Sequence, residues 1–189
     1  MRIQSILIAG LSFWAAFACT PKPEASPQAK MEKLPYFDLA GFIELEIPKV
    51  DGAKVSKISR VQNQEETADV VYSVQDWKEE LDIFFQADIN KPSLAQSYDT
   101  QTKNSSLIHT LLPGAKGKVK EITVRYDFDR PTGITVKLVE ENMFYTSTTI
   151  GQVYFNLETQ KLDHYSVEST QKIWFLKPNN MKIMGAVKL

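Results

Sequence analysis

Residues 119–189 alternate apolar and polar side chains, and this pattern constrains the fold more than any other part of the chain. Between residues 122 and 128, Ile, Val, Tyr and Phe alternate with Thr, Arg and Asp, which places the apolar set on one face of a pleated strand. Residues 129–133 break the pattern with turn residues, and it resumes from Ile134. The segments that follow, through Val187, are rich in β-branched and aromatic residues. This half of the chain therefore predicts a run of antiparallel strands.

Composition limits the class of protein and of partner. The 189 residues are 43% hydrophobic and 24% charged, which suits one globular domain with a sizeable core. The formal net charge is −1, so the chain lacks the strong positive field that would hold nucleic acid or an anionic membrane. Cys19 is the single cysteine, which excludes an intrachain disulfide.

The N-terminus reads as a signal peptide over residues 1–18. A short positive start is followed by residues 5–18, which are uncharged and mostly apolar but fall short of the ~20 residues that span a bilayer. The sequence Ala-Phe-Ala-Cys at 16–19 resembles the end of the bacterial lipoprotein signal. The resemblance implies cleavage after residue 18 and lipidation of Cys19.

The match departs from the usual lipoprotein pattern at two positions. Ala16 stands where Leu is usual, and Phe17 is bulky where a small residue is commoner. An ordinary secretory signal is the alternative, because Ala-x-Ala is also a cleavage site and would leave Cys19 free. We prefer the lipoprotein interpretation, because a lone cysteine directly before a spacer has an evident use as a lipid attachment point.

Residues 19–34 are interpreted as the lipid-anchor cysteine followed by a tether. Pro21, Pro23 and Pro27 favour an extended backbone, and the fifteen residues after the cysteine could reach roughly 45 Å at ~3 Å per residue. An N-terminal segment without a particular role fits this composition equally well. By the sorting rule of the lipoproteins that the signal resembles, Thr20 in place of Asp implies the outer membrane, on its periplasmic or surface face.

Residues 35–189 predict a single α+β domain. Residues 38–47 have helical spacing with Asp38 as cap and Pro48 at the end, and a second helix follows from Ser73 to before residue 90. A hairpin is expected at 54–61 with 67–72 around a polar turn at 63–66, and two further strands are expected at 96–102 and 106–112. The prediction is a curled antiparallel sheet, a meander or half-barrel, with two N-terminal helices packed on one face.

Several short segments resemble one family. Residues 76–81, 85–92 and 97–98, with 37–39 near the front of the domain, are similar to small lipoproteins of Bacteroidota that carry an α+β domain. Members of that family are largely without assigned function. The resemblance implies export and the α+β arrangement, and it carries over no catalytic or binding residue.

We find no sequence motif for catalysis, for a metal or for a cofactor. His109 and His164 each lie in a strand pattern without an obvious acidic neighbour, so we interpret both as ordinary sheet positions. The glycines and lysines of 114–118 lack Walker spacing and predict a turn. Glu140 and Glu141 would point to opposite faces of a strand, so they do not form an acid pair.

Aromatic side chains gather in the late strands, where they could fill the space under the helices or line a groove. The first alternative is preferred. The residues concerned are Tyr145, Tyr154, Phe155, Tyr165, Trp174 and Phe175. Trp174 lies on the opposite strand face from Phe175 and Ile173, and we expect a curled sheet to cover its indole.

The sequence thus predicts a lipid-anchored envelope protein that is a non-catalytic binding or assembly module, with an apolar ligand as one possibility. The alternative is a structural or interaction subunit of an outer-membrane complex. An apolar cavity under the helices would favour the first, and a filled core with an exposed patch the second. An enzyme of unrecognised type is the third hypothesis, which clustered titratable groups in a cleft would support.

Overall fold

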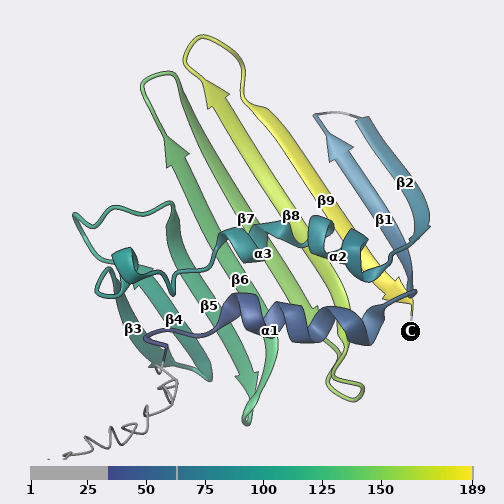
Figure 1. The fold of residues 1–189 in the computed structure, drawn as a ribbon. Coiled ribbons are helices and arrows are strands. Elements are labelled where there is room, and N and C mark those ends of the chain that lie inside the picture. The colour runs from purple at the N-terminus through teal and green to yellow at the C-terminus, as the bar shows by residue number, and fades with distance from the viewer. Residues whose placement is uncertain (1–33, 63, 189) are drawn as a thin grey trace, which may run out of the picture. The chain divides into compact units, whose positions relative to one another are not determined.

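The computed structural model describes residues 34–62 and 64–188, and Cys19, the signal peptide and nearly all of the predicted tether lie outside them. Nine antiparallel strands form one open sheet in the order β2-β1-β9-β8-β7-β6-β5-β4-β3. Helices α1, α2 and α3 cross one face of this sheet (Figure 1). An antiparallel sheet with a few helices confirms the predicted α+β class.

Strands β3 to β9 lie side by side in chain order, and the hairpin of β1 and β2 is added next to β9. The strands are β1 (Lys54–Val61), β2 (Gln64–Val71), β3 (Tyr98–Lys103), β4 (Ser106–Leu111), β5 (Val119–Asp127), β6 (Arg130–Glu141), β7 (Tyr145–Phe155), β8 (Leu162–Ile173) and β9 (Asn179–Lys188). The last strand, β9, pairs with β8 on one side and with β1 on the other, so it joins the first hairpin to the meander. Each β6 residue at 134, 136 and 138 is buried against the helices, while 137 is exposed.

Helix α1 (Leu39–Glu46) begins and ends where the sequence predicts. The Asp38 carboxylate accepts a hydrogen bond from the Gly41 backbone N–H at 3.0 Å. A Cβ atom at position 41 would collide with that carboxylate, which explains a glycine inside the first turn. The chain continues past Pro48 as the 3-10 helix η1 (Ile47–Val50), and Leu39, Ile43 and Ile47 are buried.

The second predicted helix is interrupted. It forms α2 (Val74–Glu80) and α3 (Asp82–Gln86), separated at Leu81, whose backbone leaves the helical region. Ser73 and Asp76 make the predicted capping box. The stripe of Trp77, Leu81 and Phe84 is buried as predicted, because the break keeps all three side chains on the sheet side. A further 3-10 turn, η2 (Pro92–Leu94), leads to β3.

A polar cluster joins α2 to the sheet beside this core. Glu80 on α2 accepts hydrogen bonds from the Tyr165 hydroxyl at 2.8 Å and from the Tyr72 hydroxyl at 3.1 Å. Lys57 on β1 lies 2.7 Å from the same carboxylate. The rings of Tyr72 and Tyr165 pack edge-on against Trp77, so polar and apolar contacts hold the helix at one place.

Two turns are shorter than the sequence predicts. The polar residues 64–66 belong to β2, and Arg130 already pairs with Asp127 at the start of β6, which leaves Phe128 and Asp129 as the turn. Strand β2 lies at an edge of the sheet, so its charged residues face solvent without cost. Phe128 is not on the apolar face of β5; it occupies the turn at φ 51° and is exposed.

The expectation of a covered Trp174 is wrong. Strand β8 ends at Ile173, and Trp174 lies in the turn to β9 with 79% of its surface exposed. Strand alternation no longer applies there, and no part of the sheet or of the described helices covers the indole. Of the late aromatics, Phe155 and Tyr165 are buried under the helices as predicted, Tyr145 and Tyr154 are half-buried, and Phe175 is exposed.

Candidate functional site

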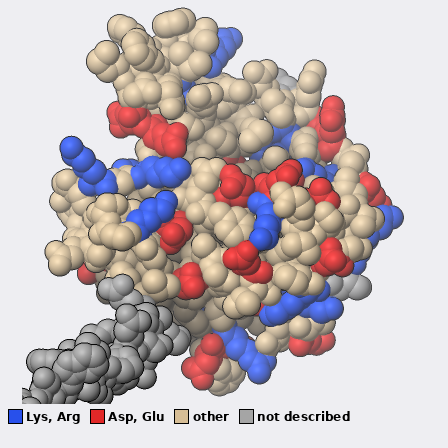
Figure 2. All heavy atoms as spheres, in the orientation of Figure 1, with Lys and Arg blue, Asp and Glu red and all other residues tan. Residues whose placement is uncertain are grey.

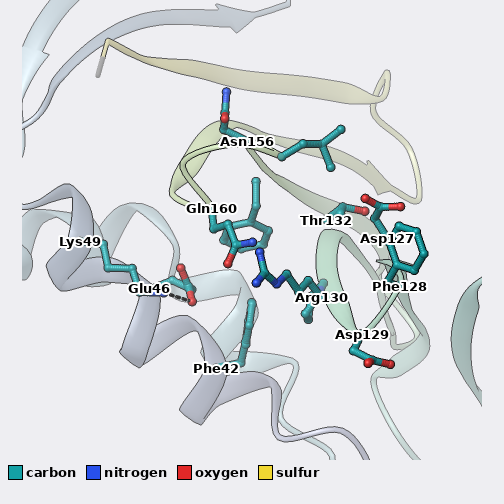
Figure 3. A pocket seen from close by; sticks show the side chains of 13 residues that line it. Phe42, Glu46, Lys49, Asp127, Phe128, Asp129, Arg130, Thr132, Asn156 and Gln160 are labelled. Carbon is teal, nitrogen blue, oxygen red and sulfur yellow. Dashed lines mark hydrogen bonds and ion pairs between the residues drawn. The ribbon is translucent and has the colours of Figure 1, made fainter.

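A pocket of about 480 Å³ opens beside α1, at the end of the sheet where β6 begins and β7 ends. Its volume lies in the range of small-molecule sites. Helix α1 and η1 form one wall, the β5–β6 turn forms the second, and the β7–β8 loop forms the third (Figure 3). Three segments that are far apart in the sequence therefore build it.

The floor of the pocket is apolar. Phe42 on α1 packs edge-to-face on Phe155 at the end of β7, with ring centroids 5.3 Å apart. Leu157 and Phe128 add exposed apolar surface at the rim. An apolar group of a ligand could therefore rest on two aromatic rings.

Glu46 supplies a buried carboxylate to the wall of the pocket. It lies one helical turn after Phe42, on the same face of α1, and is only 9% exposed. Oε1 accepts a hydrogen bond from Lys49 Nζ at 2.6 Å. Oε2 is buried without a hydrogen-bond partner in the described part of the chain. A buried acceptor left unsatisfied costs about 1–3 kcal/mol, so this oxygen is a natural position for a ligand donor.

Arg130 brings a positive charge to the same space. With its carboxamide oxygen turned toward Arg130, Gln160 accepts hydrogen bonds from Nε at 3.1 Å and from Nη1. A guanidinium has five N–H donors, so three remain for a ligand. No ion pair of Arg130 is found within residues 34–62 and 64–188. Figure 3 shows the Arg130 and Glu46 side chains pointing into one space from β6 and α1.

The loop that carries Gln160 is held in place by its own hydrogen bonds. The Asn156 side chain accepts from the backbone N–H groups of Glu158 at 3.0 Å and Thr159 at 2.9 Å. The Gln160 N–H donates to the Asn156 carbonyl at 2.8 Å, and Gln160 has a positive φ of 57°. This wall is therefore ordered before any ligand arrives, which lowers the entropy lost on binding.

The pocket offers recognition groups rather than a nucleophile with its base. Its lining provides one guanidinium, one ammonium, three carboxylates and the Thr132 hydroxyl, and it contains no His, Cys or Ser. In Figure 3 the Asp127 and Asp129 side chains turn away from Arg130. No cluster of metal-ligating side chains occurs among the described residues. The arrangement suits a molecule with an anion, a hydrogen-bond donor and an apolar group.

The two histidines lie in strands, as the sequence predicts, but away from the pocket. His164 is exposed, stacks on Tyr154, and has Asp163 at 2.7 Å, so the expectation that it lacks an acidic neighbour is wrong. Residues adjacent on a strand point to opposite faces, and the contact forms because the Asp163 carboxylate reaches back to Nδ1. His109 is buried in β4, where Nε2 accepts from the Phe37 backbone N–H at 3.2 Å and Nδ1 contacts Thr100 Oγ1 at 2.9 Å.

His109 predicts a pH-dependent stability. Burial lowers its pKa, and the Phe37 contact requires an unprotonated Nε2. The unfolded chain takes up a proton near pH 6.5 and the folded chain does not, so the free energy of unfolding falls as the pH drops below that value. The slope approaches about 1.4 kcal/mol per pH unit. Denaturant unfolding of wild type and His109→Gln between about pH 7 and pH 5 measures the difference.

The exposed histidine provides the control for this measurement. His164→Gln removes a histidine that is not buried, so any change that it causes in the dependence on pH shows how much a histidine outside the core contributes. Equal slopes for wild type and His109→Gln would show that the buried ring is not the group that titrates.

Comparison of this chain with protein-family models, with curated proteins and with solved structures finds no match. None of the helices in the described residues is long and apolar enough to cross a membrane.

Proposed function

We propose that this protein is a lipid-anchored envelope protein, attached to the outer membrane through Cys19, that binds a small molecule without transforming it. The ligand is a zwitterion with an apolar group, such as an amino acid or a short peptide. The single observation that carries the binding proposal is the buried Glu46 carboxylate oxygen, which has no hydrogen-bond partner among the described residues and lies in a pocket shared with Arg130.

Each part of such a ligand has a counterpart in the pocket. A carboxylate would meet the free N–H groups of Arg130, and an ammonium would donate to Glu46 Oε2. An apolar side chain would rest on the ring pair of Phe42 and Phe155. Trp77 and Phe84 fill the space between helices and sheet, and this filled core by itself favours the interaction subunit. The pocket beside α1 is the observation that favours a ligand. We therefore place the ligand in this pocket, outside the space between helices and sheet.

Calorimetric titration of the purified protein with three probes tests the proposal. L-phenylalanine carries all three groups, 3-phenylpropionate lacks the amine, and 2-phenylethylamine lacks the carboxylate. A hydrogen bond to a charged group contributes about 1.5–3 kcal/mol, so L-phenylalanine should bind at least about tenfold more tightly than either analogue. Equal affinities for the three probes, or no heat with any, would overturn the proposal.

A variant pair assigns the effect to the pocket. Arg130→Met should reduce the affinity for L-phenylalanine to that of 2-phenylethylamine and leave the latter unchanged. Arg60→Met is the matched control, because Arg60 is exposed on β1 and pairs with Glu65 away from the pocket. This control should bind all three probes as wild type does.

A further inference from the structure

Two neighbouring hairpin turns carry a cluster of exposed apolar side chains, which we call the apolar tip. The β6–β7 turn contributes Met143 and Phe144, and the β8–β9 turn contributes Trp174, Phe175 and Leu176. Each is between 54% and 83% exposed. Large apolar side chains scattered singly on a surface are ordinary, but five on two adjacent turns form a patch that requires an explanation.

Hydrogen bonds fix the conformation of both turns of the apolar tip. The Trp174 N–H donates to the Phe144 carbonyl at 3.0 Å, which joins the two turns. The Asn142 side chain accepts from the backbone N–H groups of Phe144 at 2.8 Å and Tyr145 at 3.0 Å. The Leu176 N–H donates to the Ile173 carbonyl at 3.0 Å. These hydrogen bonds fix the two turns, which project beyond the rest of the sheet (Figure 1), and the apolar side chains that they carry are exposed.

The charge of the tip has one sign. The two segments 142–146 and 171–180 contain Lys172 and Lys177 and no Asp or Glu. Figure 2 shows this end of the molecule as a mostly uncharged lobe, with blue beside it and red side chains below it. The rest of the visible surface mixes both signs. Apolar and aromatic side chains with lysines beside them match the interface of a bilayer, where aromatic rings lie at headgroup level and lysines reach the phosphates.

We propose that the apolar tip inserts into the interface of a lipid bilayer that contains anionic headgroups. Trp174, Phe175 and Leu176 would enter the boundary between headgroups and acyl chains, and Lys172 and Lys177 would contact lipid phosphates. The two turns project, and an open hollow of about 330 Å³ between them is lined in part by Phe144, Lys172 and Trp174. A fluid bilayer surface can fill such a hollow without a partner of matching shape. The tip would be a second contact beside the proposed lipid at Cys19, and stable membrane attachment takes two such signals.

The tip and the pocket are independent. Strand β6 begins at the pocket with Arg130 and ends near the tip with Glu141, and its twelve residues span roughly 37 Å at ~3.4 Å per residue. Insertion of the tip would therefore leave the pocket in solvent, and either proposal can fail without the other.

Trp174 reports on insertion directly. In the full chain carrying Trp14→Phe, Trp174 is the exposed tryptophan and Trp77 is fully buried. Adding vesicles of phosphatidylglycerol and phosphatidylcholine should shift the emission to the blue, and brominated acyl chains should quench it. Vesicles of phosphatidylcholine alone should give a much weaker response. Lys172→Gln and Lys177→Gln should each reduce the partition coefficient about fivefold on the anionic vesicles.

Matched charge insertions locate the contact. Phe175→Glu should abolish the shift of Trp174, whereas Leu45→Glu on α1, at a residue that is also exposed, should leave it unchanged. Absence of a shift with anionic vesicles would overturn the proposal. A response that is equally strong without anionic lipid would also overturn it, as would a shift that depends on protein concentration without vesicles, which would indicate a second copy of the chain.

Discussion

Replacing Trp77 with alanine lowers the free energy of unfolding by about 3–5 kcal/mol, the usual loss for a fully buried large aromatic residue. The indole is 0% exposed and packs edge-on against Tyr72 and Tyr165, at centroid distances of 5.0 and 5.8 Å. Its Nε1 donates to the Val50 carbonyl at 3.0 Å, so truncation also leaves a buried acceptor without its donor. Denaturant unfolding followed by circular dichroism measures the loss.

The chain contains a matched control for this substitution. Trp174→Ala removes the same side chain from a site that is 79% exposed, so the free energy of unfolding should change by less than about 0.5 kcal/mol. Similar losses for the two variants would mean that α2 is not held to the sheet by Trp77.

The second large effect concerns Cys19, which lies outside the described residues. If this cysteine carries the lipid, Cys19→Ala abolishes incorporation of an alkyne analogue of palmitate in cells, because the chain has no other cysteine. The variant should also leave the membrane fraction after a high-salt wash, which removes contacts that depend on lysines. Thr20→Ala keeps the thiol and should label normally. Persistent labelling of Cys19→Ala, or no labelling of wild type, would contradict lipidation and favour an ordinary secretory signal.

The sequence predicts most elements of this fold because each has its own local pattern. Alternation of apolar and polar residues predicts strands that are covered on one side, such as β6. Apolar residues at helical spacing predict the buried stripe of Trp77 and Phe84. Neither pattern says where a strand stops. For this reason Phe128 and Trp174 were expected on covered strand faces, although both lie in turns.

The pocket was not predictable, since its residues are close together only in the folded chain. In the sequence, Glu46 is indistinguishable from any polar residue of an amphipathic helix, and Arg130 belongs to a turn sequence. Their proximity depends on how α1 lies across the sheet and on the loop that carries Gln160. The pairing of β9 with β1 is equally non-local, because the sequence of neither strand indicates which strand it pairs with. The one signal in the sequence is an acidic residue one helical turn after Phe42, on the face that also carries Ile43 and Leu39.

If the proposed function holds, the Glu46 carboxylate serves a ligand and not the fold. A denaturant-unfolding series of wild type and Glu46→Met, with and without L-phenylalanine, distinguishes the two roles. Methionine conserves the volume and removes the unsatisfied oxygen, so the variant without ligand should be as stable as wild type or about 1 kcal/mol more stable. Wild type should gain about 2.7 kcal/mol at a ligand concentration 100 times its Kd, and Glu46→Met should gain far less. A variant that is destabilised without ligand and gains as much as wild type with it would contradict the claim.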